Sequence, residues 1–265
     1  MPDETPAEGR ITTGRDGEIF LIGIDRPKKL NGFSLGMYRE LVGAFTAMEK
    51  DDGARVGLLY AHGGNFTAGL QLDQFAPLMA RGEAAAPAGG IDPFSLREPL
   101  RTKPVVCAVQ GICFTLGIEL MLAQDIVIAA DDTRFAQIEV KRGIMPTGGA
   151  TLRFVERAGW GNAQRYLLTG DEFGPAEALR LGFVQEIVPA GKQYERALSI
   201  ARTIAEQAPL AVRASLASSR RYLEKGPLGI KPEMEAVQRK LAQTADAAEG
   251  LRSFVERRKA KFTGK

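Results

Sequence analysis

A repeated order of apolar run, glycine-rich turn and helix constrains most strongly what this chain can fold into. The run VGLLYA (56–61) leads into a glycine-rich turn, and the run PVVCAV (104–109) leads into a second turn and a helix from about residue 117. Short apolar runs without polar alternation are typical of strands buried on both faces, as in parallel sheets covered by helices. EIFLIGID (18–25) and residues 125–130 have the same character. The pattern predicts an α/β fold.

The helical segments fall into two groups. Ser34 is a suitable N-cap for a helix that continues to about Lys50. Beyond Pro189 no strand is expected, and the tail would pack on the core or on another subunit. The sequence therefore predicts a core over residues 1–190 and a helical C-terminal region over residues 191–265. The expected helices after the fourth strand are 148–158, 162–168 and 175–181, which precede a strand at 183–188, and then 191–206, 209–224, 232–246 and 247–260.

Two segments lack a clear periodic pattern. Residues 1–10, MPDETPAEGR, are polar and are expected to be loose. Residues 74–101 are rich in Ala, Gly and Pro, and predict a mobile excursion that is either a lid or a tolerated surface insertion.

Composition excludes several classes of protein. The 265 residues suffice for one large domain with a sizeable core, and 45% hydrophobic and 25% charged residues are ordinary for a globular protein. A net charge of +3 suits a small anionic ligand but is far from a nucleic-acid-binding footprint. No apolar run approaches membrane length, and the N-terminus lacks the apolar region of a signal peptide. We therefore expect no nucleic-acid or membrane partner.

The cysteines and the histidine narrow the chemistry further. Cys107 and Cys113 lie in apolar surroundings and predict buried, reduced thiols of a cytoplasmic protein, with simple packing as their role. The single histidine, His62, leaves no Ser-His-Asp set unless His62 itself serves. No cluster has the spacing of metal ligands, so no metal is expected.

Two glutamates in the stretch 110–149 are candidate acid–base groups. Glu119 lies near the start of the apolar helix GIELMLAQ, and Glu139 lies on what reads as an extended link into a Pro-Gly turn. A carboxylate among apolar neighbours has a raised pKa and exchanges protons near neutral pH, and two together could hold one water. The alternatives are a Glu favoured by the helix dipole and a solvated Glu at a strand end.

The glycine-rich turns offer backbone donors. The candidate N–H groups belong to Leu70, after Ala68-Gly69, and to Leu116, before Gly117 at a helix N-terminus. Two such donors that converge on one carbonyl oxygen would form an oxyanion hole. The alternative is a pair of tight turns required only for packing.

The motifs, taken together and in order, resemble the enoyl-CoA hydratase/isomerase, or crotonase, family. The resemblance covers about residues 11–265. Its motifs are RPKKLNG (26–32), NFTAGL (65–70), KPVVCAVQG with GIEL and DI (103–126), TRFAQIEVKRGIMPTGG (133–149), LLTGDEFGPAEALRLGFVQEIVP (167–189) and RRKAKFTGK (257–265).

The resemblance implies roles for particular residues. Glu119 matches the glutamate that activates the water, and Glu139 matches the one that protonates Cα. Leu70 and Leu116 match the two oxyanion-hole positions. The matches to coenzyme A contacts are Lys28, Lys29 and Leu30 in a loop at the nucleotide, Ala68 and Gly69 at the adenine site, and Phe262 and Lys265 in a tail that can reach a neighbour's coenzyme A.

The resemblance also implies a fold, an assembly and a reaction. The fold is a spiral of ββα repeats with a helical C-terminal region that builds homotrimers, often paired into hexamers. The implied reaction, of the kind used in fatty acid metabolism, is syn addition of water to a trans-2-enoyl-CoA to give a 3-hydroxyacyl-CoA. Coenzyme A is part of the substrate, and no further cofactor is implied. The alternatives are a Δ3,Δ2-enoyl-CoA isomerase and a non-catalytic acyl-CoA-binding subunit.

Five positions depart from the family pattern. Leu116 and its neighbour Thr115 replace glycines that often precede the first glutamate, and Gln71 replaces a common Asp. Thr147 stands where a Gly often lies near the water, and Gly64 where a basic residue is often found. None of these changes removes a catalytic carboxylate, and we expect them to affect the acyl pocket.

Overall fold

The computed structural model describes residues 8–265, and most of the N-terminal segment expected to be loose lies outside this range. Two sheets organise these residues. The strands are β1 (Arg10–Asp16), β2 (Ile19–Asp25), β3 (Val56–Ala61), β4 (Val105–Val109), β5 (Ile112–Phe114), β6 (Ile126–Ala130), β7 (Arg134–Ala136), β8 (Glu172–Phe173) and β9 (Glu186–Val188).

The larger sheet has the strand order β1-β2-β3-β4-β6-β9. Only the β1–β2 pair is antiparallel, and the other neighbours run parallel. The apolar runs predicted as buried strands form this parallel part, with β4 buried along its whole length. The smaller sheet has the order β5-β7-β8.

Successive strands divide between the two sheets in a repeating way. β4 enters the larger sheet, β5 enters the smaller sheet, and a helix follows; β6 and β7 repeat this order. An isolated β-bridge between Thr67 and Cys113 joins the turn after β3 to β5, at the edge of the smaller sheet. This arrangement is the predicted spiral of ββα units.

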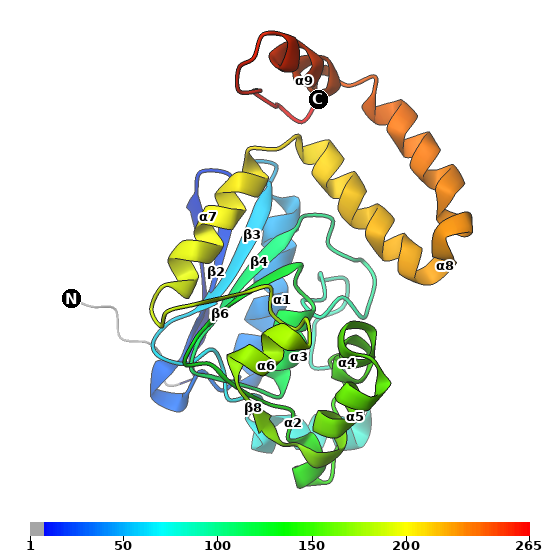
Figure 1. The fold of residues 1–265 in the computed structure, drawn as a ribbon. Coiled ribbons are helices and arrows are strands. Elements are labelled where there is room, and N and C mark those ends of the chain that lie inside the picture. Colours follow the sequence, from blue (N-terminus) through cyan, green and yellow to red (C-terminus); the bar gives the residue numbers. More distant parts are fainter. Residues whose placement is uncertain (1–7) are drawn as a thin grey trace, which may run out of the picture.

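Helices cover both faces of the larger sheet (Figure 1). The helices of the described residues are α1 (Leu35–Lys50), α2 (Leu72–Arg81), α3 (Leu116–Leu122), α4 (Ala150–Ala158), α5 (Trp160–Thr169), α6 (Pro175–Arg180), α7 (Gln193–Ala205), α8 (Pro209–Leu241) and α9 (Ala245–Val255), with 3-10 turns η1 (Pro27–Lys29) and η2 (Glu139–Arg142). Because side chains alternate along a strand, Val106 and Ala108 pack with α7, while Cys107 and Val109 belong to the main core with α1 and α3.

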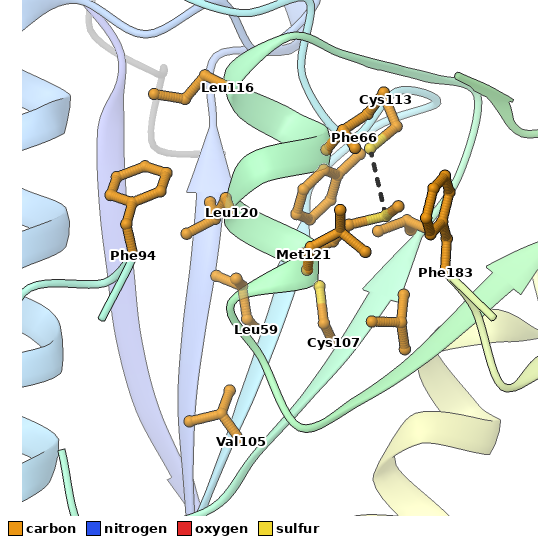
Figure 2. Close-up of a cluster of buried hydrophobic side chains, with 14 of the residues drawn as sticks. Leu59, Phe66, Phe94, Val105, Cys107, Cys113, Leu116, Leu120, Met121 and Phe183 are labelled. Atoms are coloured by element: carbon orange, nitrogen blue, oxygen red, sulfur yellow. Dashed lines mark hydrogen bonds between the residues drawn. The ribbon is translucent and has the colours of Figure 1, made fainter. Parts of the chain in front are cut away.

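Helix α3 runs through the middle of the main core. Figure 2 shows Leu116 and Leu120 on the side of α3 toward Phe94, and Met121 on the side toward Cys107 and Phe183. All seven residues of this helix are buried, so its polar member, Glu119, is held in an apolar environment.

The C-terminal helices divide between the core and an arm. α7 packs on the larger sheet through Ala197, Ala201 and Ala205, whereas α8 and α9 project away from the core (Figure 1). α8 is interrupted at Gly226, whose φ of 66° and ψ of 176° are not helical. Within the described residues, no helix is long and apolar enough to cross a membrane.

Several local predictions were wrong. Glu139 begins the 3-10 turn η2 rather than lying on an extended link. The last helix ends at Val255 and not near residue 260, because the Asp246 carboxylate accepts hydrogen bonds from the N–H groups of Thr263 and Gly264 and folds the tail back. The helix expected over 232–246 ends at Leu241.

The prediction of a surface excursion at residues 74–101 was also wrong in part. Residues 72–81 form α2, and Ile91 and Phe94 are buried in the main core. Composition alone did not reveal that this segment is anchored, because two apolar side chains are enough to hold a glycine-rich and proline-rich segment on the core.

Candidate active site

Two adjoining cavities lie beside the N-terminal end of α3. Their volumes are about 360 Å³ and about 220 Å³. The residues that line both cavities are Leu70, Met79, Leu116, Glu119 and Thr147. The smaller cavity is also lined by Glu139. The structure therefore brings together both glutamates and both residues whose N–H groups were predicted to bind an oxyanion.

Glu119 is held by backbone donors at the N-terminal end of α4. Its Oε1 accepts hydrogen bonds from the N–H of Gly148 at 2.7 Å and from that of Ala150 at 3.2 Å. Burial raises the pKa of Glu119 to about 7, the two backbone donors oppose this shift, and the charge of Glu139 adds to it. A carboxyl group with this pKa can exchange protons near neutral pH.

Glu139 is buried at the start of η2. Its Oε1 accepts a hydrogen bond of 2.8 Å from the side-chain amide of Gln137. Burial raises the pKa of Glu139, and the hydrogen bond from Gln137 opposes the shift. Among residues 8–265, Oε2 of Glu139 is buried without a hydrogen-bond partner. One oxygen is thus held by Gln137, and the other has no partner in the described part of the chain.

The N–H groups of Leu70 and Leu116 are unpaired in the described part of the chain. Leu70 is held by its neighbours, since Phe33 N–H donates to Gly69 and Gln71 N–H donates to Phe33. Leu116 is the first residue of α3, where N–H groups have no intrahelical acceptor. Both residues line both cavities, so two backbone donors are offered at the wall that also carries Glu119.

Unusual backbone conformations shape these two turns. Gly69 has a φ of 105°, and a side chain there would collide with Thr115. Thr115 itself has a φ of 49° and a ψ of −116°, which is unfavourable for a β-branched residue. The glycine that often occupies this family position would adopt the conformation without strain.

The loop predicted to touch coenzyme A lies against the first turn. Lys28 and Lys29 belong to η1, and Leu30 follows in a left-handed conformation. The carbonyl of Leu30 accepts a hydrogen bond of 3.0 Å from Ala68 N–H, so Lys28–Leu30 and Ala68-Gly69 lie together. Ala68 also lines the smaller cavity.

Phe262 and Lys265 lie elsewhere, in the tail that folds back on α9. The carbonyl of Phe262 accepts a hydrogen bond from Arg55, and the carbonyl of Lys265 accepts one from Asp246 N–H. Neither residue lines the two cavities. The expected contact of this tail with a neighbour's coenzyme A remains a prediction.

Sequence reasoning missed several residues that position the site. Gln137 fixes Glu139, and Gly148 and Ala150 fix Glu119. Asn31 is fully buried and donates to the carbonyls of His62 and Asn65, which ties the loop of residues 28–30 to the first turn. The Asn-Gly and Gly-Gly pairs in the sequence were the available signals, but they were interpreted as turns only.

The other polar and thiol candidates lie outside the site. Cys107 and Cys113 are buried free cysteines, as predicted, and Cys113 contacts Met121 at 3.9 Å. His62 lies 3.0 Å from the Thr12 hydroxyl and does not line either cavity. Among residues 8–265, no group of three or more His, Cys, Asp or Glu side chains is arranged to hold a metal ion.

Comparison with known proteins agrees with this architecture. The family model for enoyl-CoA hydratase/isomerase matches residues 14–265. The chain is 31% identical over 258 residues to enoyl-CoA hydratase EchA19 of Mycobacterium tuberculosis, with 94% of each chain covered. The chain belongs to the enoyl-CoA hydratase/isomerase family.

Solved structures share the whole fold. A probable enoyl-CoA hydratase/isomerase from Mycobacterium abscessus is 44% identical, with a TM-score of 0.93 over 96% of this chain and 98% of that one. An enoyl-CoA hydratase from Mycobacterium tuberculosis H37Rv is 31% identical, with a TM-score of 0.86 over 97% of this chain and 99% of that one. The fold is therefore the crotonase fold, including its helical C-terminal region.

Proposed function

We propose that this protein is an enoyl-CoA hydratase that adds water to a trans-2-enoyl-CoA in the syn sense and forms a 3-hydroxyacyl-CoA. One observation carries the proposal: two buried carboxyl groups with raised pKa values lie on the cavity wall that also presents two unpaired backbone N–H groups. Hydration of a conjugated thioester needs both an acid–base pair and an oxyanion site.

The thioester carbonyl oxygen would accept hydrogen bonds from Leu70 N–H and Leu116 N–H. These donors withdraw electron density and make Cβ electrophilic, and they stabilise the negative charge that develops on the oxygen. Removal of one such donor typically costs about 3 kcal/mol of transition-state stabilisation.

Glu119 and Glu139 would handle the protons. The ionised Glu119 takes a proton from the water while the water oxygen bonds to Cβ, and the electrons of the double bond move onto Cα and the carbonyl. The protonated Glu139 then donates through Oε2 to Cα. The pKa of Glu119 near 7 supports its role, because a base is most effective with a pKa near the working pH. The raised pKa of Glu139 favours the protonated form that an acid needs.

Coenzyme A would act only as the handle of the substrate. Lys28 and Lys29 offer positive charge to its phosphates, and the backbone at Leu30, Ala68 and Gly69 would line its nucleotide. The proposed reaction requires no metal or redox cofactor. We place it in the cytoplasm, where buried thiols such as Cys107 and Cys113 stay reduced.

The isomerase is the second candidate, since moving a double bond needs only one base and Glu139 would suffice. The buried Glu119, which would then have no task, favours the hydratase. Loss of enoyl absorbance on incubation with crotonyl-CoA tests the proposal. Conversion of a 3-enoyl-CoA without hydration of crotonyl-CoA would favour the isomerase, and binding without turnover of either would favour a non-catalytic subunit.

We further propose that the chain divides at about residue 190 into a core and an assembly region, and that it forms a homotrimer or a dimer of trimers. Large apolar side chains on α8 and α9 support this, since Leu228 is 87% exposed and Phe254 83% exposed. A monomer by light scattering at micromolar concentration would contradict the assembly and remove the support for Phe262 and Lys265 as coenzyme A contacts of a neighbour.

A further inference from the structure

The wall of the larger cavity contains charged side chains, which an aliphatic acyl chain would not need. Its wall contains the expected apolar side chains Phe75, Leu78 and Phe94, but also Asp92, Arg97 and the hydroxyl-bearing Tyr38. This cavity adjoins the proposed reaction centre, because Leu70, Leu116 and Glu119 line it as well. An acyl group bound by the two backbone donors could therefore extend toward these polar residues.

Asp92 is already occupied by the turn that it organises. Its two carboxylate oxygens accept hydrogen bonds from Phe94 N–H at 3.2 Å and from Leu96 N–H at 3.0 Å, and the side chain is only 4% exposed. These bonds fix the turn that presents Arg97. Asp92 therefore serves to position Arg97 and is not itself an accessible charge.

Arg97 is the accessible charge. Its Nε lies 3.5 Å from Asp92 Oδ2, and its side chain is 48% exposed. Asp92 is the sole carboxylate that forms an ion pair with Arg97 in the described part of the chain. Nε approaches Asp92, and the Arg97 side chain also forms a hydrogen bond with the Tyr38 phenol. A guanidinium carries more N–H donors than these two contacts use, so donors remain for another acceptor such as a carboxylate.

Tyr38 lies beside this arginine in a fixed orientation. Its ring stacks on Phe94 at a centroid distance of 5.9 Å and meets Phe75 edge-on at 5.7 Å. Burial raises the pKa of Tyr38 to about 12, the charge of Asp92 raises it and the charge of Arg97 lowers it, so the three groups lie close enough to interact. The phenol stays protonated near neutral pH and can donate a hydrogen bond.

The charge of Glu83, another acidic residue of the cavity wall, is balanced by Arg81, which does not line the cavity. Arg81 donates to both of its oxygens, at 2.6 Å and 3.0 Å. A purely aliphatic chain would cover Arg97 without giving its remaining donors a partner, which is unfavourable. A chain that ends in an anionic acceptor would satisfy them.

We propose that Arg97, with Tyr38, selects 2-enoyl-CoA substrates whose acyl chain carries a carboxylate at its far end. This inference rests on the proposed hydratase function and extends it to the substrate class. Arg97 binds the distal carboxylate, and Asp92 is a positioning residue.

The test compares pairs of substrates of equal length. Trans-2-enoyl-CoA thioesters of six and eight carbons are prepared with either a terminal carboxylate or a terminal methyl group. The wild type should show a kcat/KM at least about tenfold higher for the carboxylated member at one or both lengths. Arg97→Gln should abolish this preference, mainly through a higher KM, and should change kcat/KM for the methyl-terminated member by less than about threefold.

Two controls exclude indirect effects. Arg97→Lys keeps the charge but not the planar fork, and should retain part of the preference. Arg196→Gln removes an exposed, ion-paired arginine on α7, far from the cavity wall, and should leave both substrates unchanged.

Each result decides the proposal. A wild type without the preference overturns it, as does an Arg97→Gln variant that keeps the preference. If no 2-enoyl-CoA is hydrated, the proposed function fails, and binding of the saturated thioesters is then measured by calorimetry. Tighter binding of the carboxylated thioester that is lost in Arg97→Gln would uphold the inference without catalysis, and equal binding would overturn it.

Discussion

Gly148 both binds Glu119 and leaves room for it. Its N–H donates a hydrogen bond of 2.7 Å to Glu119 Oε1, and a Cβ at this position would lie 2.6 Å from Oε2. The glycine therefore fixes the carboxylate at a separation that no other residue would permit.

Gly148→Ala should reduce hydration strongly while the protein still folds. The added methyl group must displace the Glu119 carboxylate, and a small displacement of a catalytic group has a large effect on rate. We expect kcat for crotonyl-CoA to fall about 10²-fold, with secondary structure retained by circular dichroism. Gly43→Ala is the matched control, since nothing lies within 4 Å of its added Cβ in α1. Full activity of Gly148→Ala would mean that the position of Glu119 is not critical.

Removal of either carboxylate should separate binding from catalysis. Glu119→Gln and Glu139→Gln keep the size of the side chain and should bind coenzyme A thioesters normally, and each should lose about 10²- to 10⁴-fold in hydration rate. The rates come from loss of enoyl absorbance and the binding from calorimetry. A Glu119→Gln variant that retains hydration would contradict the two-glutamate mechanism. Loss restricted to Glu139→Gln, together with better turnover of a 3-enoyl-CoA, would establish the isomerase.

The pKa of Glu119 predicts a pH dependence of stability. Its value of about 7 in the folded protein exceeds the ordinary value of 4.5, so the folded state holds the proton more tightly than the unfolded state between these limits. The free energy of unfolding therefore falls as pH rises from about 4.5 to about 7, by roughly 3 kcal/mol in total from this group.

Glu119→Gln should remove this dependence. Its melting temperature relative to wild type should be higher at pH 8 than at pH 5, as measured by calorimetry at both pH values. In wild type, kcat/KM should also fall below about pH 7, where the proposed base becomes protonated. An identical difference in melting temperature at both pH values would show that Glu119 is not destabilised by burial.

Leu116 should restrict the acyl group through its side chain, because it lines both cavities while its N–H serves as donor. Leu116→Gly should keep hydratase activity and enlarge the space beside the thioester. It should cost about 0.5–1 kcal/mol from backbone entropy, besides the lost packing. The measurement is the ratio of kcat/KM for a long-chain and a short-chain enoyl-CoA, which should rise. An unchanged ratio would mean that the side chain only packs. A folded but inactive variant would mean that the turn itself depends on Leu116.

The parts of the fold that follow local pattern could be predicted from the sequence. β3 and β4 are apolar runs between turn residues, and α1 begins after the predicted cap, where the Ser34 hydroxyl accepts from Met37 N–H at 3.2 Å. The strands β5 and β7 could not be predicted, because three residues carry no periodicity and their pairing arises only when the two strands meet.

Some residues of the candidate site could likewise be predicted from the sequence, and others could not. Glu119 stood out because a charged residue interrupts an apolar helix, and the structure places it on a cavity wall with Leu70 and Leu116. Arg97 and Tyr38 could not be found, because residues 59 positions apart become neighbours only when residues 91–94 insert into the core. The 3-10 turn at Glu139 packs against α5, a contact that the local sequence does not reveal.

The wall of the larger cavity is built from a buried helix and from an irregular segment. Glu119 is carried by α3, which is buried on every side, whereas Leu96 and Arg97 belong to an irregular segment outside the helices and strands. Substitutions in that segment can alter the acyl wall without disturbing the helix that carries the carboxylate. Proteins with this architecture can therefore keep the reaction while their substrates change, because the catalytic carboxylate and the acyl wall lie on different segments.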